Sequence, residues 1–220
     1  MRSLTIEMEL PTADIETALL AEGCSLVGGI DEVGRGAWAG PVSVGVSVVN
    51  LAALTAMPIG LRDSKALSPS QRERMFPALA AACVAYAVGH ASPAECDELG
   101  MTAAQGLATR RAIAELSTAP DAVIVDGRHD FTGHPRSVLV VGGDRCSLAV
   151  AAASVLAKVT RDAILVASAR EFPDYGFERH KGYCSAEHRA AVRARGLTRL
   201  HRRRWAVAGF GPEDDAADEV

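Results

Sequence analysis

The sequence has few aromatic residues, few cysteines and no long hydrophobic run. Of its 220 residues 5% are aromatic, and the five cysteines are far apart and in no paired metal-ligand spacing. An odd number of scattered cysteines argues against a disulfide framework or a zinc site and favours a reducing compartment. Charged residues interrupt the first twenty positions, and every apolar run is too short to cross a bilayer. We therefore expect a cytoplasmic protein without a signal peptide or membrane contact.

Charge is unevenly distributed along a chain whose hydrophobic content, 49%, is enough for one full-sized core. The net charge is −4, yet Glu178 to Arg204 holds nine Lys and Arg against two acidic residues, and Glu213 to Glu219 holds five acids. The basic segment predicts either a local anion-binding surface or a solvated basic helix. Charge alone leaves both interpretations open.

Hydrophobic periodicity predicts an α/β order. Apolar runs predict strands at 26–33, 42–49, 83–90, 122–126 and 137–141, and helical patterns cover 12–23, 68–82, 102–116, 147–171 and 185–195. In the helix at 147–171 one apolar stripe runs from Leu148 to Val166, and Ser154, Lys158 and Arg161 recur on a neighbouring face. A mixed sheet flanked by helices is the expected architecture.

Four carboxylates fall at strand ends or just before a helix: Asp31, Glu32, Asp126 and Asp144. A carboxylate in an apolar strand is costly unless a cation lies against it, and ligands of open α/β sheets gather near strand ends. Each carboxylate taken singly could instead cap a helix or pair with an arginine. Together they form an oxygen-only set, which suits Mg²⁺ or Mn²⁺ and argues against zinc.

One feature of this set conflicts with regular strand geometry. Asp31 and Glu32 are adjacent, so in a regular strand their side chains point to opposite faces. Nearby glycines would permit a bulge, but the spacing does not settle the question. The pair is followed by Gly34, Arg35 and Gly36, where two glycines allow the backbone to approach a sugar or phosphate, or simply form a hairpin turn.

The motifs taken in order resemble type 2 ribonuclease H, the ribonuclease HII family. The resemblance covers about residues 27 to 205 and rests on segments at 31–36, 39–42, 63–65, 125–127, 143–144, 151–162, 175–177 and 180–183. It implies a ribonuclease H-like fold, with a five-stranded mixed sheet, flanking helices and a C-terminal helical extension. The expected organisation is a lead-in at 1–23, a catalytic domain at 24–172, a basic substrate-binding extension at 173–210 and a disordered acidic tail at 211–220.

The resemblance also implies an activity and its residues. The family cuts the RNA strand of RNA/DNA hybrids and cuts DNA duplexes on the 5′ side of an embedded ribonucleotide, leaving a 3′-hydroxyl and a 5′-phosphate. Asp31, Glu32, Asp126 and Asp144 are the implied catalytic residues and ligands of two Mg²⁺ or Mn²⁺ ions. The same resemblance places the backbone of Gly34, Arg35 and Gly36 on the 2′-hydroxyl and Tyr183 on the next sugar. The residues expected near phosphates are Lys65, Ser154, Lys158, Arg161 and Lys181.

The sequence departs from the family pattern at several positions: Ala37–Trp38, the region of Gly100, Cys184–Ser185 and Arg204–Trp205. None of these departures removes an expected ligand, but they leave substrate positioning and C-terminal packing open. No clamp-binding motif follows Trp205, and we expect a monomer. The main alternative is another nuclease of the same fold, such as a resolvase or transposase. A non-catalytic nucleic-acid-binding domain is a third interpretation, against which the intact carboxylates argue.

Overall fold

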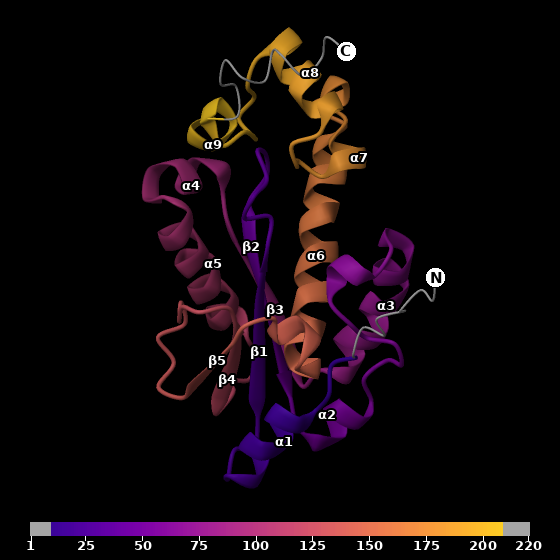
Figure 1. Ribbon diagram of the computed structural model, residues 1–220, viewed down its shortest axis with the longest axis vertical. Helices are drawn as coiled ribbons and strands as arrows, with labels where there is room; N and C mark the ends of the chain where they lie inside the picture. Colours follow the sequence, from indigo (N-terminus) through magenta and orange to yellow (C-terminus); the bar gives the residue numbers. More distant parts are fainter. Residues whose placement is uncertain (1–9, 209–220) are drawn as a thin grey trace, which may run out of the picture. The chain divides into compact units, whose positions relative to one another are not determined.

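Helices and strands are interspersed along the chain in the computed structural model, which describes residues 10–208 (Figure 1). The strands are β1 (Val27–Val33), β2 (Val42–Val49), β3 (Ala85–Ala91), β4 (Ala122–Asp126) and β5 (Ser137–Val140). The helices are α1 (Asp14–Ala21), α2 (Leu51–Thr55), α3 (Pro69–Ala82), α4 (Pro93–Leu99), α5 (Met101–Glu115), α6 (Leu148–Ser168), α7 (Phe177–His180), α8 (Ala186–Arg195) and α9 (Arg203–Ala208). Short 3₁₀ turns span Ser64–Ala66, Gly143–Arg145 and Pro173–Tyr175.

The five strands form one mixed sheet, as expected, and their order in it is β3-β2-β1-β4-β5. Strand β1 pairs in parallel with β4, and β4 pairs in parallel with β5. The register sets Ile30 opposite Val125 and Asp126 opposite Val140. The carboxyl ends of β1 and β4 therefore lie at the same edge of the sheet.

Every residue of β2 is buried, so the valine and serine faces that alternate in the sequence are both covered. The hydroxyls of the buried serines are paired: Ser47 Oγ donates to the carbonyl of Ala149 at 2.7 Å, and Ser43 Oγ lies 2.7 Å from His90 Nδ1. A buried hydroxyl without such a partner would be destabilising. Strand β2 is therefore covered on both faces. The small serine side chains on one face leave room for the layer that packs against them.

Helix α6 passes so close to β1 that only a glycine fits at the crossing. A Cβ built on Gly29 would lie 2.1 Å from the carbonyl carbon of Ala149. Side chains from Ala149 to Ala157, except Ser154 at 3% exposure, are fully buried, so the first half of α6 is covered on all sides. The predicted single apolar stripe is wrong at its far end, because Val166 is 45% exposed.

Helices α3 and α4 begin with sequence features typical of a helix start. Ser68 and Ser92 each form a capping box, with Gln71 and Glu95 respectively, and each is followed by a proline in the first turn. The short helices α2, α7 and α9 have no such periodic signal and were not predicted.

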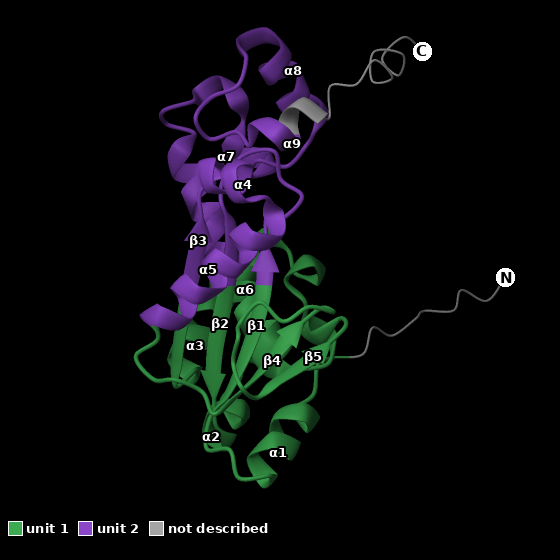
Figure 2. Cartoon of the chain, turned by 90° about the vertical axis from the view of Figure 1, so that its left-hand side faces the viewer, with its two compact units in different colours: residues 1–31, 45–87, 116–156 green, residues 32–44, 88–115, 157–220 purple. Residues whose placement is uncertain are grey.

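The described chain forms two compact units, which Figure 2 colours separately. The first contains residues up to 31, 45–87 and 116–156, and its core includes Leu19, Val27, Ile124 and Val150. The second contains 32–44, 88–115 and 157 onward, and its core includes Leu165, Tyr175, Phe177 and Val192. The division into lead-in, catalytic domain and basic extension stays a prediction, and the acidic tail lies outside the described residues.

Among the described residues, no helix combines the length and the apolar character that crossing a membrane requires.

Helix α1 contributes a buried carboxylate to the first unit. Glu16 is 0% exposed, and its Oε1 accepts hydrogen bonds from Ser147 Oγ at 2.5 Å and from the backbone N–H of Ala149 at 2.8 Å. Its Oε2 is buried and has no hydrogen-bond partner in the described part of the chain. Glu16 thus satisfies donors at the start of α6, directly after the turn that carries Asp144.

We expect Glu16→Ala to lower the free energy of unfolding by about 1–3 kcal/mol, because two buried donors lose their acceptor. Glu16→Gln should cost less, since its amide oxygen can replace Oε1. Urea unfolding of both variants, with the exposed Asp14→Asn as a control on the same helix, measures the difference. Equal stability of Glu16→Ala and wild type would show that the hydrogen bonds contribute nothing.

Candidate active site

Three of the predicted carboxylates belong to the first unit, where the sheet edge and one turn place them. Asp31 follows Ile30 near the end of β1, and Asp126 is the last residue of β4, so the parallel register brings both to one edge. Asp126 Oδ1 accepts a hydrogen bond from the N–H of Gly143 at 2.8 Å, which fixes the turn that carries Asp144. Asp31 and Asp144 are each only 4% exposed.

A fourth carboxylate and a lysine join these three. In the 3₁₀ turn that follows Asp63, Lys65 Nζ lies 3.6 Å from Asp144 Oδ2 and 3.8 Å from Asp63 Oδ1. Burial lowers the pKa of Lys65, but the charges of the carboxylates outweigh it, so the pKa is raised. The carboxylates that act on this ammonium are Asp63, Asp31, Asp144 and Asp126. Asp63 was missed as a site residue, although its position beside Ser64 and Lys65 in one motif was a usable signal.

The electrostatics of this carboxylate group favour a bound cation. Burial, followed by the charge and hydrogen bond of Asp63, raises the pKa of Asp144 to about 6, and Lys65 opposes this rise. In the described residues, no three His, Cys, Asp or Glu side chains are already arranged to hold an ion. The donors are nonetheless all carboxylate oxygens, and their mutual repulsion raises the proton affinity of Asp144. This chemistry fits a hard divalent cation.

Glu32 belongs to the second unit and contacts a different element. Strand β1 continues without interruption through both Asp31 and Glu32 to Val33. Glu32 Oε2 accepts a hydrogen bond from Gln105 Nε2 of α5 at 3.2 Å, and Gln105 Oε1 accepts from Arg35 Nη1 at 2.7 Å. Gln105 was not predicted, because nothing in the local sequence links it to residues some 70 positions earlier.

The turn that follows β1 requires glycine at its first position. Gly34 has φ +81°, and a Cβ there would lie 2.0 Å from Arg161 Nε. At Gly36 a Cβ would meet nothing within 4 Å, so space beside the backbone is open. The backbone at this second glycine is therefore accessible to a ligand.

Two residues expected near phosphates are buried instead. Arg161 is 0% exposed and donates to three backbone carbonyls: Nε to Pro41 at 2.9 Å, Nη2 to Ala39 at 3.0 Å and Nη1 to Lys181 at 3.0 Å. Ser154 is 3% exposed and donates to Ser64 Oγ at 2.8 Å. The prediction that these side chains lie near phosphates does not fit their burial. Helical spacing gave their common face correctly but not its exposure.

Lys158, Lys181 and Tyr183 lie together in the second unit. The Tyr183 ring has Lys158 Nζ at 5.2 Å and Arg161 Cζ at 5.3 Å from its centroid. Lys158 also pairs with Asp162 at 2.8 Å, and Lys181 adopts φ +52° and donates from Nζ to the carbonyl of Glu178. Tyr183 and Lys181 are partly exposed, so both remain accessible to a ligand.

Comparison with known proteins decides the family. Residues 28–208 match the family described as Ribonuclease HII. A ribonuclease HII from Streptomyces coelicolor is 47% identical over 207 residues, covering 93% of this chain and 88% of that protein. The chain belongs to the ribonuclease HII family. A second relative, the ribonuclease HII of Streptomyces griseus, is 49% identical over 203 residues, covering 90% of this chain and 85% of its own.

Solved structures agree with this assignment. The ribonuclease H2 of Pyrococcus horikoshii superposes with a TM-score of 0.72 at 27% identity, covering 88% of this chain and 100% of that one. The ribonuclease H-like fold predicted from the sequence is therefore confirmed. As a ribonuclease HII-family member the chain is a ribonuclease H, an endonuclease and hydrolase of a family that depends on divalent metal ions.

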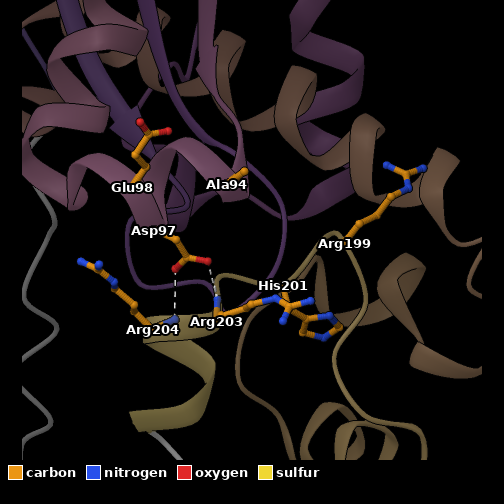
Figure 3. Close-up of a pocket in the computed structure, with 7 residues that line it drawn as sticks. All are labelled: Ala94, Asp97, Glu98, Arg199, His201, Arg203 and Arg204. Carbon is orange, nitrogen blue, oxygen red and sulfur yellow. Dashed lines mark hydrogen bonds between the residues drawn. The ribbon is translucent and has the colours of Figure 1, made fainter.

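The basic C-terminal segment of this ribonuclease HII-family chain is not uniformly exposed. Arg202 is 0% exposed and donates to the carbonyls of Gly40 (2.9 Å) and Arg35 (3.0 Å), so it supports a turn and is no candidate for phosphate contact. A pocket of about 560 Å³ lies beside α9 (Figure 3). Its lining residues are Ala94, Asp97, Glu98, Arg199, His201, Arg203 and Arg204. Asp97 accepts hydrogen bonds from the backbone N–H groups of Arg203 and Arg204, and none of the predicted site residues lines this pocket.

A chain of hydrogen bonds through two buried histidines reaches the backbone of Tyr183. The N–H of Thr198 donates to His201 Nδ1 at 3.0 Å, His201 Nε2 lies 3.0 Å from His188 Nε2, and His188 Nδ1 lies 2.9 Å from the carbonyl of Tyr183. This assigns the proton of His201 to Nε2 and that of His188 to Nδ1. Burial lowers the pKa of each ring to about 4. The ring of His180 stacks on His188 at 4.3 Å.

These shifts predict a loss of stability in acid. An unfolded histidine has a pKa near 6.5, so between that value and about pH 4 the unfolded chain binds more protons than the folded one. The contribution of these two histidines to the free energy of unfolding should fall through this window as the pH decreases, by an amount on the order of a few kcal/mol.

Urea unfolding at a series of pH values tests this expectation. His188→Phe should show a shallower pH dependence in the same window than wild type, whereas the exposed His129→Gln should keep the wild-type slope. A wild-type slope in His188→Phe would rule out the buried pair as its source.

Proposed function

We propose that this protein is a metal-dependent endoribonuclease that hydrolyses the RNA strand of RNA/DNA hybrids and cuts 5′ of ribonucleotides embedded in duplex DNA. The products would be a 3′-hydroxyl and a 5′-phosphate, and the cellular roles ribonucleotide excision and RNA primer removal. The observation that carries the proposal is the group of carboxylates around Lys65, of which Asp31 and Asp144 are buried, in a chain of the ribonuclease HII family.

The proposed ligands are Asp31, Glu32, Asp126 and Asp144, with Mg²⁺ or Mn²⁺ as the ion. When bound by these residues, two divalent ions would supply an attacking water of lowered pKa and stabilisation of the leaving 3′-oxygen. The carboxylates supply the negative charge that holds such ions. Asp63 raises the pKa of Asp144 and Lys65 lowers it, so these two residues adjust that charge.

The remaining residues bind and orient the substrate. Main-chain groups of Gly34, Arg35 and Gly36 read the 2′-hydroxyl, and the space beside Gly36 supports this role. Lys65, Lys158 and Lys181 contact phosphates, and Tyr183 packs on the following sugar. Arg161 and Ser154 act indirectly in this scheme, because their buried polar groups hold the backbone and the 3₁₀ turn in place.

We further propose that the protein is a monomer and is located in the cytoplasm. Its five free cysteines suit a reducing compartment and so support this location. The alternative activity, cleavage of DNA by a resolvase-like enzyme of the same fold, would not require a ribose at the cut. A duplex with one ribonucleotide, compared with the same duplex in all-DNA form, therefore distinguishes the two activities.

Asp126→Asn and Asp31→Asn should each reduce cleavage of the single-ribonucleotide duplex by at least about a hundredfold, because loss of a ligand charge misplaces the reacting groups. Folding and binding of the hybrid should remain close to wild type. The exposed Asp14→Asn is the matched control. A chelator should abolish cleavage by the wild type, and addition of Mg²⁺ or Mn²⁺ should restore it. Near wild-type rates in either variant would remove that residue from the site.

Tyr183→Ala should lower turnover about a hundredfold while weakening substrate binding much less, because the ring positions the sugar beside the scissile phosphate. Tyr183→Phe keeps the stacking face and should retain most activity. Rates on single-ribonucleotide and all-RNA hybrid substrates would be compared for both variants. If Tyr183→Ala cleaves both substrates at wild-type rates and with the same ratio, the ring has no part in substrate positioning.

A further inference from the structure

Gln105 has an unusual place among the buried residues of α5. The buried face of this helix consists mainly of small residues, and Ala104, Ala108 and Ala112 are each 0% exposed. Gln105 itself is 3% exposed, and it carries a full amide into this surface. A buried primary amide is destabilising unless both its ends are hydrogen-bonded, so its partners account for its presence.

Both partners of the amide belong to the proposed reaction site. Nε2 donates to Glu32 Oε2 at 3.2 Å, and Oε1 accepts from Arg35 Nη1 at 2.7 Å. The chemistry of the partners fixes the orientation of the amide, because a carboxylate only accepts and a guanidinium only donates. One neutral side chain therefore lies between a proposed metal ligand and the turn proposed to read ribose.

The elements around this bridge fix its position. A Cβ on Gly89 of β3 would lie 2.1 Å from the carbonyl oxygen of Ala108, so α5 lies directly against the strand. Arg35 is held at its other end, since its carbonyl accepts from Arg202 Nη1 at 3.0 Å. The amide thus connects a fixed helix to both the strand end and the turn.

The bridge also separates opposite charges. Glu32 and Arg35 are three residues apart, and a direct ion pair between them would turn the carboxylate toward the guanidinium and away from an ion. An interposed amide satisfies both groups with charge-assisted hydrogen bonds and keeps them apart.

We propose that Gln105 is a positioning residue that couples the Glu32 carboxylate to the Gly34–Arg35–Gly36 turn. The inference rests on the proposed function, because it assigns Glu32 to metal binding and the turn to ribose recognition. Its consequence is that the fit of a ribose at the turn and the orientation of the ligand depend on the same amide.

The test compares Gln105→Met with Thr109→Val. Gln105→Met keeps the length of the side chain and removes both hydrogen bonds, whereas Thr109→Val removes a buried hydroxyl one turn further along α5 without a change in the site. Calorimetric titration of Mn²⁺ into the substrate-free enzyme measures the metal affinity, to which the Glu32 carboxylate is proposed to contribute. Binding of a single-ribonucleotide duplex and of the all-DNA duplex, both in chelator, measures recognition by the turn.

For Gln105→Met we expect Mn²⁺ binding weakened about tenfold and a reduced preference for the ribonucleotide duplex, the size expected for one charge-assisted hydrogen bond. Thr109→Val should match wild type in both. A Gln105→Met protein that is merely less heat-stable, with either measurement unchanged, overturns the coupling. If wild type itself binds no Mn²⁺ and shows no ribonucleotide preference, the proposed function fails, and the inference fails with it.

Discussion

The buried guanidinium of Arg161 holds together the loops on which the second unit depends. A charged group that leaves water is strongly destabilising unless its donors are satisfied, and here three backbone carbonyls satisfy them. Two of these carbonyls belong to the turn after Gly36 and one belongs to Lys181, two residues before Tyr183. Burial lowers the pKa of Arg161, and the carboxylate of Asp162, 3.9 Å from Nη1, opposes that shift. Gly34 must lack a side chain because the same guanidinium fills that space.

Charge is divided between the two units in a way that suits a reaction on a polyanion. In the first unit, carboxylates lie around the ammonium group of Lys65, and their negative charge favours the binding of a cation. The second unit buries Arg161 and Arg202, which donate to backbone carbonyl oxygens, and Asp162 lies 3.9 Å from Arg161.

The sequence predicts the positions of local features better than their surroundings. The strands and the carboxylates at their ends were predicted because apolar runs and parallel pairing obey simple rules. The burial of Ser154 and Arg161 could not be predicted, because helical spacing gives a face but not what covers it. Gln105 and the pair of His188 and His201 could not be predicted, since their contacts join segments that only the folded chain brings together. Whether the four predicted carboxylates act together stays a prediction.

The hydrogen bonds between Glu16 and the start of α6 limit how far the chain can be shortened from its N-terminal side. The family match begins at residue 28, whereas Glu16 lies in α1, twelve positions earlier. A chain trimmed to the matched residues would retain every proposed ligand but would leave the hydroxyl of Ser147 and the amide of Ala149 without their acceptor. The boundary of the shared family segment is therefore not the boundary of the folding unit, which begins at least as early as α1.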